Sequence, residues 1–280
     1  MITSYHIPSP PLNSYINYVY YRDVPMPYPR EKILPLPTLD LKVNFGGAWQ
    51  AYEADQVEPF AVCTESWCVG LWGVYHLVDW PPDVQFFMVE FKPGGAYPFL
   101  QFPLSELHNQ VVSLEAIWGH FAAEIRERLD AAPTIPARFA LLERLLLARL
   151  REAPYGLNAV QYAVAEIARH HGALSIKALS NYMGISHKHL IAQFKQLVGG
   201  TPKELARLYR FRHILHSIDP TQPVDWALVA HQSLYYDQSH FTNDFKTFTG
   251  HSPTDYLRLR RRVHAENPEH AKYLRQLPTG

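Results

Sequence analysis

The chain has 280 residues, of which 47% are hydrophobic and 13% aromatic, and this composition excludes an intrinsically disordered chain. Its formal net charge is zero, and no uninterrupted apolar run approaches the roughly 18 residues that a membrane-spanning helix needs. Because the N-terminus also lacks a basic segment followed by an apolar one, we expect a cytoplasmic protein with no membrane partner.

Residues 1–110 are predicted to form a mostly β domain. They are rich in proline and contain short aromatic or β-branched runs, such as LDLKVNF at 39–45 and VQFFMVEFK at 84–92. Several such strands separated by glycine and proline are typical of a compact barrel or sandwich.

The same domain holds many large aromatic side chains, which could line a binding pocket or simply fill the core. Small-molecule sites are mostly apolar with few polar groups, whereas large aromatics are core material in any domain. A pocket for a small-molecule effector, if these rings form one, is expected to be lined by Trp49, Trp72, Tyr75, His76 and Trp80.

The two cysteines of the chain, Cys63 and Cys68, also lie in this domain. Their spacing fits neither a disulfide framework nor the paired Cys-x-x-Cys pattern of a structural zinc site. We expect both to be ordinary reduced thiols.

Residues 111–153 are predicted to contain two helices. Residues 113–132 begin with a serine suited to a helix N-cap and place apolar residues at helical spacing, and residues 136–152 repeat that period after a proline. The second helix is apolar enough to pack against a second copy of the chain, but periodicity fits two helices that cover their own domain equally well. The stretch APYG at 153–156 is predicted to be a linker.

The zero net charge hides an uneven distribution along the chain. Residues 1–154 carry a net charge of −6, whereas residues 155–280 carry +6 and 11 of the 15 histidines. Such an asymmetry predicts a phosphate-facing domain joined to a domain with a different task.

The second half of the chain contains an internal repeat. SHKHLIAQFKQLVGGTP at 186–202 aligns without gaps with DQSHFTNDFKTFTGHSP at 237–253, an offset of 51 residues. Both copies start with a good N-cap residue and keep one apolar stripe, formed by Leu190, Phe194 and Leu197 in the first copy and by Phe241, Phe245 and Phe248 in the second.

A shorter helix precedes each copy, and one continuous helix from Pro202 to about Asp219 is predicted to connect them. Helix, short turn and capped second helix is the order of a helix-turn-helix, whose second helix lies in the DNA major groove. The sequence therefore predicts an α+β protein with a mostly β N-terminal domain, two helices, an all-α C-terminal domain with two helix-turn-helix units over 157–265, and a tail over 266–280.

Residues 170–262 resemble the DNA-binding domain of the AraC/XylS family of transcription regulators. The matching pattern reads Ala230, then Leu234-Tyr235-Tyr236-Asp237-Gln238-Ser239-His240-Phe241, then Phe245, Phe248, Gly250, Pro253 and Tyr256. The resemblance implies a regulator that binds double-stranded DNA, contacts RNA polymerase, and carries an N-terminal domain that senses an effector and often forms a homodimer. We expect no enzymatic activity and no cofactor.

Helices 187–198 and 238–249 are expected to read two successive major grooves. If the apolar stripe points inward, the opposite stripe faces DNA, together with first-turn residues. These residues are His187, Lys188, Ile191, Ala192 and Lys195 in the first unit and Gln238, Ser239, Thr242, Asn243 and Lys246 in the second.

The chemistry of this stripe differs between the two units. Asn243 is suited to pair with adenine, and the hydroxyls of Ser239 and Thr242 can bond to several base edges, whereas Ile191 and Ala192 offer only apolar contact to thymine methyl groups. Members of the family that this domain resembles commonly have arginine at the positions of Ala192 and Asn243. A plainly solvated helix face is the alternative interpretation, and His189 and His240 fit capping or packing within the motif as well as they fit DNA contact.

Arginines on the connecting helix and after the second unit are expected to neutralise phosphates. They are Arg207, Arg210, Arg212, Arg258 and Arg260, followed by Arg261 and Arg262.

One residue departs from the pattern of the repeat. Leu234 occupies the place matched by Gly184, where the first helix of the motif usually ends in a left-handed conformation. A bulky residue there is expected to cost on the order of 1 kcal/mol.

An enzyme is the alternative to a regulator. DNA-repair proteins that use this DNA-binding architecture carry a reactive thiol, but no positive residue lies near Cys63 or Cys68 to lower its pKa. His213 and His216 have helical spacing for a shared metal but no acidic partner, so we expect no metal site. The alternative that remains open is a DNA-repair or small-molecule enzyme with a catalytic N-terminal domain.

Overall fold

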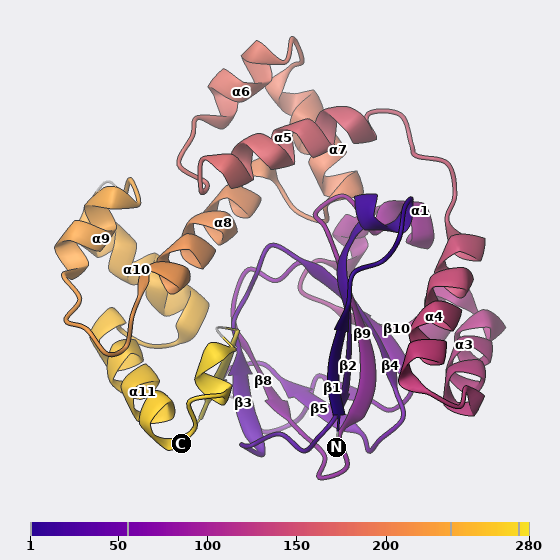
Figure 1. Cartoon of the computed structure of the whole chain (residues 1–280). Coiled ribbons are helices and arrows are strands. Elements are labelled where there is room, and N and C mark those ends of the chain that lie inside the picture. The colour runs from indigo at the N-terminus through magenta and orange to yellow at the C-terminus, as the bar shows by residue number, and fades with distance from the viewer. Residues whose placement is uncertain (1, 55, 236, 274, 280) are drawn as a thin grey trace.

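The structure, a computed structural model, describes residues 2–54, 56–235, 237–273 and 275–279. Figure 1 shows a β domain flanked on one side by helices α3 (His120–Ala131) and α4 (Ile135–Arg149), with the C-terminal helices arching over it to the other side. Among the described residues, none of the helices combines the length and hydropathy needed to cross a bilayer.

Two antiparallel sheets form the β domain. One has six strands in the order β1-β2-β9-β4-β7-β10 and the other five in the order β11-β3-β8-β5-β6. The strands are β1 (Ile2–His6), β2 (Ile16–Asp23), β3 (Arg30–Ile33), β4 (Leu39–Asn44), β5 (Trp49–Tyr52), β6 (Ala61–Cys63), β7 (Ser66–Val69), β8 (His76–Asp79), β9 (Gln85–Phe91), β10 (Val111–Ser113) and β11 (Gln276–Pro278).

Strand alternation divides the residues of the six-stranded sheet between two cores. Phe87, Val89 and Phe91 of β9 pack in the cluster that includes the buried residues of α3 and α4, whereas Phe86 packs in the cluster that joins the two sheets. Successive side chains of a strand point to opposite faces, so β2, β7 and β9 contribute to both clusters.

The predicted helical pair covers its own domain. Ser113 caps α2 (Leu114–Trp118) as expected by accepting from the Ala116 N–H at 3.2 Å, but Gly119, at φ +59°, then separates α2 from α3. The apolar face of α4 packs in the same cluster as the six-stranded sheet through Phe139, Leu141, Leu142, Leu145 and Leu146. Shorter helices α1 (Tyr97–Leu100), η1 (Leu12–Ser14) and η2 (Leu104–Leu107) complete this part of the chain.

Seven helices of the described chain form the C-terminal domain. They are α5 (Leu157–Arg169), α6 (Ile176–Tyr182), α7 (His187–Leu197), α8 (Pro202–Ser217), α9 (Trp226–Gln232), α10 (Gln238–Thr249) and α11 (Pro253–Glu266). The repeat is visible in the caps, because Ser186 accepts from the His189 N–H at 3.1 Å and Asp237 from the His240 N–H at 2.7 Å. Thr201 and Glu204 form a reciprocal capping box at the start of α8, the single connecting helix that the sequence predicts.

Leu234 has the left-handed backbone that its match to Gly184 predicts. Its φ is +53° and that of Gly184 is +68°. The same pair of hydrogen bonds ends both helices, from Gly184 and Ile185 to the carbonyls of Asn181 and Ser180, and from Leu234 and Tyr235 to those of His231 and Ala230. Glycine adopts this conformation without the clash of Cβ that strains leucine.

We predict that Leu234→Gly raises the free energy of unfolding by up to about 1 kcal/mol, because the left-handed strain disappears. Little packing is lost, since Leu234 is 63% exposed. Urea unfolding followed by circular dichroism measures the effect. Leu228→Gly is the matched control on a right-handed helical residue of α9, 51% exposed, where glycine should destabilise by about 1 kcal/mol. Equal destabilisation by both changes would contradict the strain.

The tail packs onto the β domain, an arrangement that the sequence did not predict. A short helix, η3 (His270–Lys272), leads into β11, and β11 pairs antiparallel with β3 at the edge of the five-stranded sheet. The β domain thus includes β10, beyond residue 110, and a strand from the far end of the chain.

Candidate nucleic-acid interface and sensor cavity

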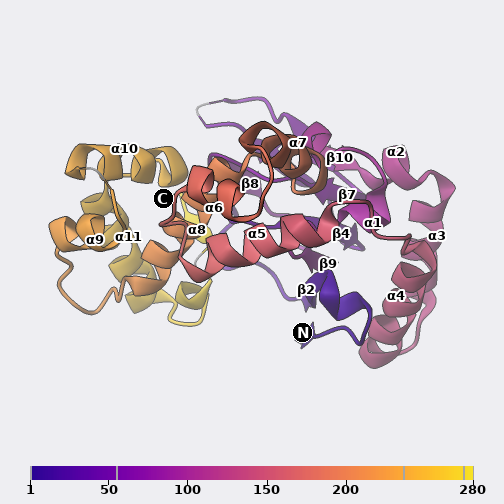
Figure 2. The same cartoon turned by 90° about the horizontal axis from the view of Figure 1, so that it is seen from above.

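The second helices of the two units, α7 and α10, lie on the same side of the molecule (Figure 2). Their predicted inner stripes are buried: Leu190, Phe194 and Leu197 are at most 1% exposed, and so are Phe241, Phe245 and Phe248. The helices therefore turn their opposite faces outward.

The outward stripe is accessible along both helices. Ile191 and Thr242 are half-buried, and the other predicted readers are exposed, namely His187, Lys188, Ala192, Lys195, Gln238, Ser239, Asn243 and Lys246. His189 and His240 are exposed as well, and the ring of His240 also packs edge-to-face on Tyr235 with a centroid distance of 5.2 Å. Tyr236, which belongs to the pattern that resembles the family, lies outside the described residues.

A groove separates the two units on this side. It is lined from α7 by His187 and Ile191, from α10 by His240 and Asp244, and from α8 by Lys203, Arg207 and Arg210. The guanidinium of Arg207 forms a two-point contact with Asp244, 2.7 Å and 3.3 Å long, which ties the connecting helix to α10. Arg210 lies over the ring of Tyr235 at 5.0 Å and donates to the carbonyl of Gly172.

Three other arginines that were expected to contact phosphates lie outside this groove. Arg258 is exposed and paired with Asp255 at 2.8 Å. Arg212 stacks over Tyr209 and lines a cavity of the β domain. Arg260 is 4% exposed and donates to the carbonyls of Ala271 and Tyr273 in the tail. A phosphate contact needs an accessible guanidinium, so the burial of Arg260 corrects the expectation that it contacts phosphate. Arg212 faces the β domain.

A cavity of about 320 Å³ lies between the two sheets. Trp49, His76 and Trp80 line it as expected, but Trp72 and Tyr75 do not, which corrects the expectation for those two residues. Trp72 packs on His76 and Phe60, and Tyr75 packs against Gly250. The sequence expectation missed the lining from the other sheet and from the C-terminal half, which includes Tyr18, Tyr20, Trp67, Phe86, Met88, Arg212, Leu215, His216, Tyr273 and Arg275.

The ionisable side chains of the cavity wall include Asp40, Lys42, Glu90 and Arg275. Asp40 on β4 accepts from Lys42 at 3.2 Å and from Arg275 of the tail at 2.6 Å. Burial alone would raise the pKa of Asp40, but Arg275 and Lys42 hold it below its ordinary value. Burial and the charge of Asp40 raise the pKa of Glu90, which accepts from the Tyr18 hydroxyl at 2.7 Å.

Other titratable groups of this domain are held neutral by burial. Burial lowers the pKa of His76 to about 3, so its imidazole is uncharged near neutral pH. Burial also raises the pKa of Cys63 to about 11 and that of Cys68 to about 12. Both cysteines are free and remain thiols near neutral pH, which makes them poor nucleophiles. In the parts of the chain that the structure describes, no three histidine, cysteine or acidic side chains form a metal-binding group.

Comparison with known proteins matches both halves of the chain to family models. A helix-turn-helix domain model matches residues 179–259, and a model of a domain of unknown function, DUF6597, matches residues 4–113. No curated protein sequence matches the chain.

Solved structures with a similar layout are distant. ToxT from Vibrio cholerae is 11% identical, with 85% of this chain and 96% of ToxT covered and a TM-score of 0.44. ToxT with a bound unsaturated fatty acid is also 11% identical, covering 85% of this chain and 94% of that one, again with a TM-score of 0.44. The AraC-like transcriptional activator CuxR is 13% identical, with 77% of each chain covered and a TM-score of 0.24.

The fold and the exposed faces of α7 and α10 define a helix-turn-helix protein with two units. More particularly, the chain carries a helix-turn-helix domain of the AraC type in its C-terminal half and a DUF6597 domain in its N-terminal half.

Proposed function

We propose that this regulator binds a specific DNA sequence by placing α7 and α10 in two successive major grooves. The observation that carries the proposal is that both helices, joined through α8, lie on the same side of the molecule (Figure 2) and carry accessible stripes. Successive major grooves recur on one face of B-DNA at about 34 Å, one helical turn.

The exposed side chains support different tasks for the two units. In the second unit, Ser239, Thr242 and Asn243 offer hydrogen bonds to base edges, with Asn243 suited to adenine. In the first unit, Ile191 and Ala192 offer apolar contact, so Lys188 and His187 carry the polar contacts. The groove between the units, with Lys203 and Arg210 on its α8 wall, fits the phosphate backbone that runs between two major grooves.

We also propose that the cavity between the sheets holds a small-molecule effector. Its walls combine aromatic rings with a few charged groups, the composition typical of small-molecule sites. Arg212, Leu215 and His216 of α8 line the same cavity, so an effector would touch the helix that sets the placement of both units. RNA polymerase and a second copy of the chain are the further partners that we expect of a regulator of this family.

The two tasks predict different responses to substitution. Asn243→Ala should relax the preference at one base pair by about 1–3 kcal/mol. Lys246→Ala should weaken all sequences alike and lower the dependence of log K on log salt by about one unit. Fluorescence-anisotropy titrations of the selected site and its single-base variants, at several salt concentrations, measure both. Identical behaviour of the two variants would contradict the assignment.

The function itself is tested by selecting genomic fragments with the purified full chain, followed by footprinting. We expect protection of one discrete site that spans two adjacent major grooves. A protein that retains no fragment above non-specific DNA, or that transfers a group from modified DNA to Cys63 or Cys68, would instead support the enzyme alternative.

A further inference from the structure

The tail, defined as residues 267–273 and 275–279, is built into the β domain. Strand β11 pairs with β3 in the register Gln276 to Ile33 and Pro278 to Glu31, and the Leu34 N–H donates to the Arg275 carbonyl at 2.7 Å. Leu277 is completely buried and belongs to the same apolar cluster as the core of the C-terminal domain. The tail therefore shares its packing with both domains.

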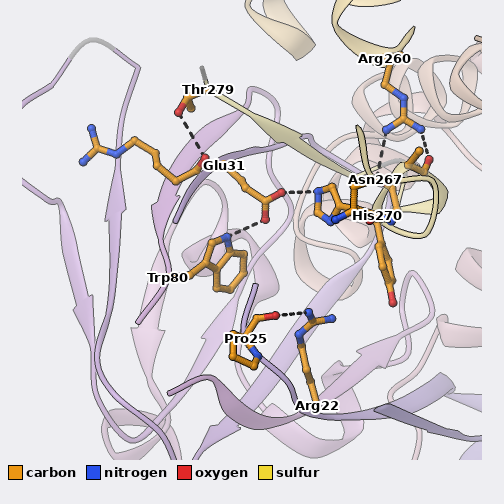
Figure 3. Close-up of polar contacts among 11 residues, drawn as sticks. Arg22, Pro25, Glu31, Trp80, Arg260, Asn267, His270 and Thr279 are labelled. Atoms are coloured by element: carbon orange, nitrogen blue, oxygen red, sulfur yellow. Dashed lines mark hydrogen bonds and ion pairs between the residues drawn. The ribbon is translucent and has the colours of Figure 1, made fainter. Parts of the chain in front are cut away.

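Two buried contacts to carboxylates anchor the tail inside the β domain. His270 lies 2.6 Å from Glu31, with both side chains at most 2% exposed, and Trp80 donates to the other oxygen of Glu31 at 2.8 Å (Figure 3). Arg275 lies 2.6 Å from Asp40 at the wall of the cavity, and the side chain of Asp40 is fully buried. Each pair joins a side chain of the tail to a carboxylate of a strand.

The other end of this connection is the second helix-turn-helix unit. Arg260 of α11 donates to the Ala271 and Tyr273 carbonyls of the tail (Figure 3). Lys32 of β3 lies 2.9 Å from the imidazole of His251, two residues after the end of α10. Gly250 is so close to Tyr75 that a Cβ on Gly250 would lie 2.7 Å from the ring. The second unit is therefore held to the β domain by contacts that have no part in reading DNA.

We propose that the tail is an intrachain latch, which holds the second helix-turn-helix unit against the β domain and so restrains it from adjusting to its groove. The proposal rests on the proposed DNA-binding function. When α11 and the end of α10 are held against the β domain, the β domain sets the orientation of the second unit. Binding to two major grooves at once requires the orientation that the DNA sets.

The chemistry of the latch suits release. A buried ion pair such as Asp40–Arg275 contributes little net stability because the charges lose their hydration. A three-residue edge strand adds few hydrogen bonds. The Arg275 contact also forms part of the cavity wall, so occupancy of the cavity and docking of the tail are thermodynamically linked.

The experiment compares three full-length or near full-length proteins: wild type, a chain that stops after Asn267, and the double variant Arg30→Cys with Thr279→Cys. Thr279 donates to the Arg30 carbonyl across the end of the ladder, so a disulfide between these positions would close the latch reversibly. The buried native cysteines are not competing partners. Arg30→Cys alone is the control for loss of the arginine.

Hydrogen exchange is the first readout. In the shortened chain, we expect faster exchange in α10 and α11 and unchanged exchange in α5. The oxidised double variant should exchange more slowly there than its own reduced form. Unchanged exchange in α10 and α11 between these states would overturn the latch, whether or not the protein binds DNA.

Affinity for the fragments selected by wild type is the second readout. We expect the shortened chain to bind about 5- to 150-fold more tightly, the usual range of coupling between sites, and the oxidised form to bind more weakly than the reduced one. Equal affinity of the oxidised and reduced forms would also overturn the proposal. If wild type selects no fragments, the proposed function fails, and the exchange measurements still decide whether the tail restrains the unit.

Discussion

Asp40→Ala should lower the free energy of unfolding by about 3–5 kcal/mol, the usual cost of removing one partner from a buried ion pair. The carboxylate is fully buried and accepts from both Lys42 and Arg275. Without it, Lys42 and Arg275 would lie side by side in a buried part of the cavity wall. Urea unfolding at neutral pH measures the change.

An exposed ion pair of the same domain provides the control. Asp79 pairs with Arg30, and about a third of its side chain is exposed. Asp79→Ala should therefore cost no more than about 1 kcal/mol. A loss of similar size for Asp40→Ala would mean that the buried triad contributes no more than a surface pair.

The contribution of Asp40 should also depend on pH in a defined direction. Its pKa in the folded protein is below the ordinary value, so its stabilisation is complete above the unfolded pKa of about 3.9 and is lost as the pH falls through the folded value. The difference in unfolding free energy between wild type and Asp40→Asn should therefore be constant above about pH 5 and shrink below about pH 4. A difference that grows on acidification would contradict the lowered pKa.

Phe245→Ala should destabilise the protein by about 3–5 kcal/mol, because it deletes a whole ring from a closed core. Phe245 is 1% exposed. Its ring contacts, with centroid distances of 5.1 to 5.9 Å, are to Phe211, Trp226, Phe241 and Tyr256. These residues come from α8, α9, α10 and α11, so the cavity would weaken the packing of α10 against the other three helices.

Thermal unfolding followed by circular dichroism measures this loss. Phe194→Ala, the equivalent change in the first unit, should cost a similar amount, since Phe194 is also fully buried. Tyr155→Ala, at a residue that is 96% exposed, should stay within about 0.5 kcal/mol of wild type. If Phe245→Ala were as mild as Tyr155→Ala, the inward direction of the stripe on α10 would be wrong.

The sequence predicted the C-terminal domain well because its signals are local. Ser186 and Asp237 cap their helices, the apolar stripes point inward, and Leu234 has the left-handed backbone of its glycine counterpart. Each of these depends on residues within one or two helical turns. That α7 and α10 read DNA remains a prediction.

The β domain and the tail were predicted less completely because their contacts are distant in sequence. Strand alternation could have placed Tyr18 and Tyr20 beside Phe86 and Met88 once β2 was known to pair with β9, but that pairing is not visible in either strand alone. The role of Arg260 was missed for the same reason. Arginines at the end of a helix in a DNA-binding domain typically neutralise phosphates. The guanidinium of Arg260 is buried because the tail folds back and accepts its hydrogen bond.

The pairing of β11 with β3 also orders events during synthesis. Chains emerge from the ribosome N-terminal part first, and domains generally fold as units. The edge of β3, however, receives its neighbour only from residues 276–278, so its backbone groups and the carboxylates of Glu31 and Asp40 stay without their tail partners until the DNA-binding helices have been made. The first domain to emerge is thus among the last parts of the molecule to be completed, and nascent chains expose an open strand edge throughout translation of the second half.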